Sequence, residues 1–127
     1  MHGSDMDGFG DEKEQSMNSQ TQTARIRELN DKFRRTGEGG QQFITPGISD
    51  MGMFEMLAVR QMVAAYDGFC EDNDPYGEHD FGSLTYEGEK MFWKIDYYDT
   101  TLTQGSPDPA DPAVTTRVLT IMLAQEY

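Results

Sequence analysis

The sequence predicts a single small α+β domain, in which a small, mainly antiparallel sheet is covered by helices. Three segments carry apolar residues at helical spacing, and two neighbouring segments after residue 80 alternate with a period of two. With one further short strand, the expected order of elements is α-β-α-β-β-α. A length of 127 residues suits one domain with a tail. It excludes large multidomain enzymes, eight-unit βα barrels and doubly wound nucleotide folds.

Residues 1–23 show no periodicity and contain few large apolar side chains. Such a segment buries too little surface to offset the entropy of ordering it. We therefore expect residues 1–23 to form a disordered acidic tail and residues 24–127 to form the single α+β domain.

The first helix of the predicted domain follows Thr23, which can cap it, and runs to about Arg35. Ile26, Leu29 and Phe33 form a narrow apolar stripe at helical spacing. Gly37 suits the position that ends such a helix. A short strand over 41–45 and a turn at Pro46-Gly47 are expected next.

A second helix is predicted from about Met51 to Tyr66, with Asp50 as its cap. Its apolar positions recur at steps of three and four residues and make a wide face. We expect this helix to lie at the centre of the core.

Residues 81–87 and 90–99 form the clearest β-hairpin of the sequence. A tight turn at Gly88-Glu89 would pair Tyr86 with Met91 and Leu84 with Trp93. The alternation places apolar side chains on one face of the hairpin and polar ones on the other. The apolar face comprises Leu84, Tyr86, Met91, Trp93, Ile95 and Tyr97, and the polar face comprises Ser83, Thr85, Lys94 and Asp96.

A final helix is predicted from Pro112 onward, after a proline-rich loop over 104–112. Asp111 is a suitable N-cap, and proline is favoured at the first helical position. The broad apolar face of this helix would comprise Val114, Val118, Leu119, Ile121, Met122 and Leu123.

The formal net charge of −13 is concentrated in two parts of the chain. Residues 1–20 carry −4, and residues 67–89 carry eight acidic residues and no basic one. Acidic surfaces are steered toward basic clefts. We therefore predict a partner-binding surface made of Asp67, Glu71, Asp72, Asp74, Glu78, Asp80, Glu87 and Glu89.

The densest acidic stretch also suggests a metal site. Asp72, Asp74 and Gly77 match positions 1, 3 and 6 of an EF-hand-type loop, but Ser83 stands where a bidentate glutamate is required. One hypothesis is therefore a Ca²⁺ or Mg²⁺ site formed by Asp72, Asp74 and His79, and otherwise no cofactor is expected. The alternative is a turn in which Asp and Asn side chains bond to their own backbone before the strand begins.

Nucleophilic and acid–base chemistry has weaker candidates. The acidic neighbours of Cys70 disfavour its thiolate, so a small packing residue is the better interpretation. His79 is interpreted as a capping or ion-paired side chain, and Lys94 as a partner for Asp96. Asp96, Asp99 and Glu78 would have to lie together to provide acid–base catalysis.

Three stretches, DNDPYGEHDFG, FWKIDYYD and SPDPADPAVTTRVLTIMLAQEY, carry a resemblance to a known family. From about Arg25 to Tyr127 the chain resembles small uncharacterised bacterial proteins that are often carried by plasmids and other mobile elements. The family is catalogued as a domain of unknown function, so it supplies no catalytic residues. The resemblance implies a mobile-element setting, where small proteins often counter host defence or stabilise the plasmid.

Two classes of function remain open. The first is a non-enzymatic binding protein that inhibits a basic, nucleic-acid-handling host protein by charge mimicry, or that serves as a plasmid-maintenance or regulatory module. The second is a small metal-dependent or acid–base enzyme with its site at residues 72–80. Direct binding to nucleic acid is not expected of so acidic a chain. A single cysteine, no signal peptide and no apolar run near the ~18 residues of a membrane span favour a cytoplasmic protein.

Overall fold

The computed structural model describes residues 4–127, with side chains described from residue 19 onward. The helices are α1 (Ser4–Thr36), α2 (Pro46–Ser49) and α3 (Met53–Ala65), the strands are β1 (Gly40–Ile44), β2 (Phe81–Tyr86), β3 (Glu89–Tyr98) and β4 (Thr116–Leu123), and two short 3-10 turns span Pro112–Val114 and Ala124–Glu126. The predicted α+β class is confirmed, although the order of elements differs from the expected one. No helix within the described residues is long and apolar enough to cross a membrane.

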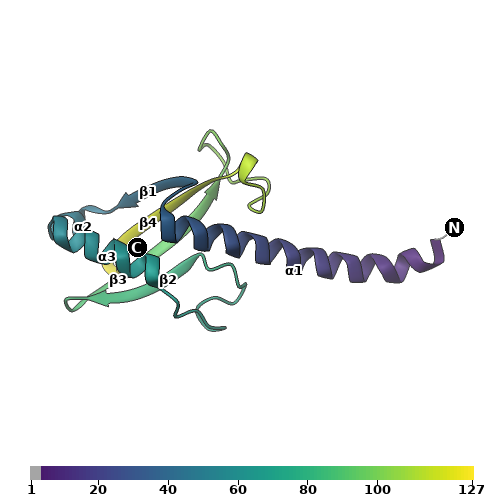
Figure 1. Ribbon diagram of the computed structural model, residues 1–127, viewed down its shortest axis with the longest axis horizontal. Coiled ribbons are helices and arrows are strands. Elements are labelled where there is room, and N and C mark those ends of the chain that lie inside the picture. The colour runs from purple at the N-terminus through teal and green to yellow at the C-terminus, as the bar shows by residue number, and fades with distance from the viewer. Residues whose placement is uncertain (1–3) are drawn as a thin grey trace.

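The four strands form one mixed sheet in the order β1-β4-β3-β2. β4 pairs antiparallel with β3 and parallel with β1, and β3 pairs antiparallel with β2. The end of α1, with α2 and α3, covers one face of this sheet (Figure 1). The core between the two layers is formed by Phe33, Ile48, Val59, Val63, Met91, Trp93, Ile95, Leu119, Ile121 and Leu123.

The predicted C-terminal helix is wrong, because residues 116–123 form β4. Asp111 does cap a helical turn, since its side chain accepts a hydrogen bond from the Ala113 N–H at 2.9 Å, but that turn ends at Val114. The following residues are rich in β-branched and apolar side chains, as in a strand buried between two neighbours. Such a short continuous apolar run fits a helix and a buried strand equally well by spacing alone.

The hairpin is confirmed with its register moved by two residues. Its turn lies at Glu87-Gly88, both with positive φ (51° and 81°), as a tight hairpin turn requires. Leu84 therefore pairs with Met91, and Trp93 pairs with Gly82. Because side chains alternate with a period of two, a shift of two residues leaves both predicted faces unchanged.

The helices differ from the prediction at their ends. α1 begins at Ser4 instead of Thr23 and extends well beyond the sheet (Figure 1). α3 begins after Gly52, and Pro46-Gly47 opens the short helix α2. Gly37 ends α1 with φ of 77°, as predicted. The division of the chain into a disordered tail and a domain at residue 24 stays a prediction.

Gly82 is a position where the core tolerates no side chain. It pairs with Trp93, and a Cβ built on it would overlap the indole ring. We predict that Gly82→Ala lowers the free energy of unfolding by about 1–3 kcal/mol, because the buried indole must move. Urea denaturation monitored by tryptophan fluorescence measures this loss.

Gly105→Ala is the matched control, since a Cβ there would meet only the Tyr97 carbonyl oxygen at 3.9 Å. Equal stability of the two variants would contradict the close packing of Trp93 against β2.

Candidate functional site

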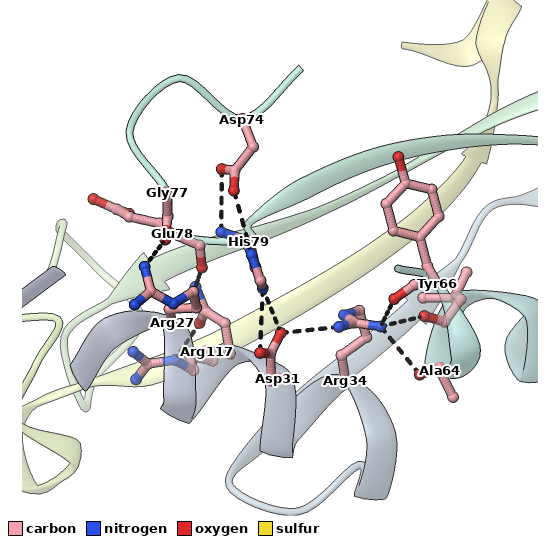
Figure 2. A network of polar contacts seen from close by, with 12 residues as sticks. Arg27, Asp31, Arg34, Ala64, Tyr66, Asp74, Gly77, Glu78, His79 and Arg117 are labelled. Carbon is pink, nitrogen blue, oxygen red and sulfur yellow. Dashed lines mark hydrogen bonds and ion pairs between the residues drawn. The ribbon is translucent and has the colours of Figure 1, made fainter. Parts of the chain in front are cut away.

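The acidic loop, defined here as residues 67–80, connects α3 to β2 and is bonded along one side of α1. Arg27 Nη1 donates to the Gly77 carbonyl at 2.9 Å, and Asn30 Nδ2 donates to the Glu78 carbonyl at 3.0 Å. Figure 2 shows Arg27 reaching from α1 to Gly77 of the loop. Two successive loop residues, 77 and 78, are therefore held by one helix.

His79 makes the third contact between the loop and α1. Its Nδ1 lies 2.9 Å from Asp31 Oδ1, and its Nε2 lies 3.6 Å from Asp74 Oδ2 (Figure 2). Its ring stacks on Phe69 with centroids 3.7 Å apart. Both ring nitrogens of His79 therefore lie near carboxylates, and its interpretation as a capping or ion-paired side chain stays a prediction.

Arg34 connects the same network to α3. Its side chain is 1% exposed, and its Nη1 donates to the carbonyl oxygens of Val63, Ala64 and Tyr66 at 2.9–3.0 Å. Carbonyls at the end of a helix have no partner within the helix, so this guanidinium supplies what the end of α3 lacks. Its Nη2 donates to Asp31 at 2.9 Å, which makes Asp31 a shared partner of Arg34 and His79.

A second buried network surrounds Asn30. Its amide donates to the Tyr97 hydroxyl at 2.7 Å and accepts from Arg117 Nε at 2.6 Å. The Tyr97 hydroxyl donates to Glu78 Oε1 at 2.7 Å. Burial, and then the hydrogen bond to Glu78, raise the pKa of Tyr97, so its phenol stays protonated; burial lowers the pKa of Arg117.

Sequence reasoning missed Asn30, Arg34 and Arg117 as structural residues. All three are buried. One signal was present, because Asn30 and Arg34 lie four and eight residues after Ile26 and therefore on the buried side of α1.

The eight acidic residues predicted as one surface are divided by the fold. Asp67, Glu71 and Asp72 are exposed on the acidic loop and form no ion pair with another described residue. Asp74 and Glu78 face inward and bond to His79 and Tyr97. Glu87 and Glu89 lie at the far end of β2, a strand about 20 Å long. Only the loop carboxylates can thus form one local surface.

The residues of the metal hypothesis are not gathered into one site. Asp74 contacts His79, but Asp72 is exposed. Over the residues whose side chains are described, no group of three His, Cys, Asp or Glu could hold a metal ion. The alternative, a turn that bonds to its own backbone, is confirmed: Asn73 Oδ1 accepts from the Cys70 N–H at 2.9 Å, and Asn73 Nδ2 donates to the Gly68 carbonyl at 2.8 Å.

The acid–base candidates also lie apart. Asp96 pairs with Lys94 at 2.9 Å, as expected, on the face of the sheet that the helices do not cover. Glu78 bonds to Tyr97 on the helix side. Asp99 accepts from the backbone and hydroxyls of its own loop, chiefly from Thr103, and these bonds lower the pKa of Asp99. These three carboxylates are each bonded to a different partner and do not form an acid–base pair with one another.

Asp80 is the acidic residue whose replacement tests the burial of the loop's end. Burial, and then the nearby Glu78, raise the pKa of the Asp80 carboxyl. A raised pKa means that the folded state favours the protonated form, so this contribution to stability is lost as the pH rises through that pKa. We predict that Asp80→Asn raises Tm at pH 7 and that the gain disappears at low pH, as measured by calorimetry.

Asp67→Asn is the control, because Asp67 is exposed on the same loop. A Tm gain of Asp80→Asn that did not depend on pH would contradict the raised pKa.

Arg34 is predicted to contribute more to stability than any exposed arginine of α1. Arg34→Met keeps the aliphatic stem but removes one partner of Asp31 and the side-chain donor to three carbonyls at the end of α3. We expect the free energy of unfolding to fall by about 3–5 kcal/mol, as when one partner of a buried pair is removed. Chemical denaturation measures the difference.

The neighbouring Arg35→Met makes the same change of charge at an exposed position and should change stability by no more than about 0.5 kcal/mol. A similar loss in both variants would show that charge, and not the buried contacts, determines the effect.

Comparison with known proteins places the chain in a family without assigning a chemistry to it. A family model described as "Protein of unknown function (DUF3768)" matches residues 44–126, which is more than half of the chain. Searches of curated proteins and of solved structures each found no match. The match includes the acidic loop and β2 to β4 but not α1, to which that loop is bonded. On this match over residues 44–126, the chain belongs to the DUF3768 family of proteins of unknown function.

Proposed function

We propose that this chain is a non-enzymatic binding protein that presents the outer carboxylates of its acidic loop to a basic protein partner. The observation that carries this proposal is the contrast within the loop. Residues 77–79 are bonded to α1, while Asp67, Glu71 and Asp72 are exposed. The loop therefore combines a fixed base with an open, negatively charged surface.

A fixed loop favours binding for a thermodynamic reason. Ordering a flexible segment on association costs free energy, and a segment that is already held avoids much of that cost. Its negative charge steers a basic partner toward it and repels the phosphates of nucleic acid. A protein partner with a basic cleft therefore fits the loop better than nucleic acid does.

The side chains best suited to acid–base chemistry contact one another within the protein, and this supports binding over catalysis. Asp74 and Asp31 flank His79, and Glu78 accepts from Tyr97. A general base must reach a substrate proton, whereas these groups are bonded to one another.

The resemblance to mobile-element proteins suggests the class of partner. Nucleic-acid-handling enzymes of host defence carry basic clefts, so an acidic inhibitor of such an enzyme is the specific form of the proposal. A plasmid-maintenance or regulatory partner would bind the same surface. The identity of the captured protein distinguishes this hypothesis from inhibition of a host-defence enzyme.

The proposal predicts that the partner is lost when the outer carboxylates are neutralised. Immobilised full chain should retain a basic protein from host lysate at about 50 mM NaCl and release it at about 500 mM, because salt screens the attraction. An excess of DNA duplex should also release it. The triple variant Asp67→Asn/Glu71→Gln/Asp72→Asn should retain at least about tenfold less of the same protein.

The matched control neutralises three exposed acids outside the loop, Asp50, Glu87 and Glu89. It changes the net charge by the same amount and should retain the partner. Equal loss in both triple variants would point to net charge alone, and retention that ignores salt and DNA would refute the proposal.

A further inference from the structure

The sheet has an open face, defined as the side opposite the helices, and this face is hollowed and partly apolar. A groove of about 740 Å³ runs over β1, β4 and β3. Its floor includes Val118 and Met122, and its rim includes Phe43, Leu102 and Tyr127. The three rim side chains are 54%, 41% and 71% exposed. Large apolar side chains gathered around one groove are typical of a surface that binds another molecule.

Leu102 is held at this rim in a conformation that leucine rarely adopts. Its φ is 60°, in the left-handed region. Asp99 maintains the loop, because its carboxylate accepts from the backbone N–H groups of Thr101 and Thr103 at 3.2 and 3.0 Å. Strain that the surroundings maintain in this way often marks a functional position. Here it presents an apolar side chain to solvent at the edge of the groove.

The charges of the open face balance within the face itself. Lys94 and Asp96 pair at 2.9 Å on β3, and Lys90 lies over the Phe92 ring at 5.4 Å. Glu126 is bonded to Thr45 and to the Gly47 N–H. Two such faces therefore bring no excess of one charge into the contact, and Lys94 of one copy can pair with Asp96 of the other. A two-fold dimer requires this kind of self-complementary patch.

The rest of the surface is less suited to a second copy. The acidic loop is bonded to α1 on the helix side of the sheet, so its carboxylates lie away from the open face. The outer side of α3 exposes Phe54 and Leu57, but its groove is lined by Arg35 and Arg60. A symmetric pair formed through α3 would bring two arginines from each copy into one interface. Charge therefore favours the open face.

The open face is smaller than a standard interface and suits a weak dimer that dissociates on dilution. Four strands about 4.8 Å apart and about 25 Å long cover on the order of 500 Å² before their rims are counted. The loop after β3 and the turn after β4 add Leu102 and Tyr127. A standard interface buries about 800 Å² per partner. From the neutral charge, the apolar groove and this area, we propose that the open face docks the open face of a second copy of the chain, giving a two-fold dimer.

The test is the oligomeric state of the full chain and its variants. Sedimentation equilibrium should give twice the 14.4 kDa mass of one chain, with dissociation on dilution. Phe43→Asp places an unpaired carboxylate on the open face of each copy and should raise the dimer Kd at least about tenfold. Leu102→Gly removes the rim side chain and suits a positive φ, so it should also raise the dimer Kd without lowering the Tm of the monomer.

Phe54→Asp is the matched control, because Phe54 is 84% exposed on α3 and lies outside the open face. It should leave the dimer Kd unchanged. A monomer at every concentration would overturn the proposal. So would an equal effect of Phe43→Asp and Phe54→Asp, or an effect of Phe54→Asp alone, which would make α3 the interface.

Discussion

The buried guanidinium of Arg34 is the interaction on which the rest of the structure depends. It joins the end of α1 to the last carbonyls of α3, and through Asp31 it orients the carboxylate that meets His79. It also lies 5.3 Å from the centroids of the Phe69 and Trp93 rings. The helix layer, the core and the acidic loop thus share one charged group. Removing a charge from water is costly, so such a group is stable only when its partners are all in place.

Helix α1 covers the sheet and also holds the acidic loop in position. Phe33 completes the core, while Arg27, Asn30 and Asp31 hold the acidic loop. All of these residues precede residue 44, where the match to the family model begins. Their partners lie inside the matched region. The local position of the loop in this chain is therefore set by a helix that the family model does not include.

Periodicity explains which features could be predicted from the sequence. The apolar stripe of α1 and the two faces of the hairpin follow from local spacing, and a turn misplaced by two residues left the hairpin faces correct. The wide apolar face predicted for α3 is only partly core, because Val59 and Val63 are buried while Met53, Leu57 and Met62 are exposed. β4 could not be recognised, because its position in the sheet depends on pairing with β1 and β3, far away in the chain. Asn30 and Arg34 were missed for the same reason, since apart from Asp31 within α1 their partners lie 29 to 87 residues away.

The fold separates acidic residues that lie close together in the sequence. Eight acidic residues between 67 and 89 suggest one surface, yet Asp74 and Glu78 are used internally and Glu87 and Glu89 lie at the opposite end of β2. What remains is a small acidic surface on one side of the sheet and a neutral, apolar face on the other. A dimer formed through the neutral face would carry two acidic loops directed away from its interface. Two linked loops raise the effective concentration of the second for a partner bound by the first, so modest charge attraction at each loop would yield stronger binding overall.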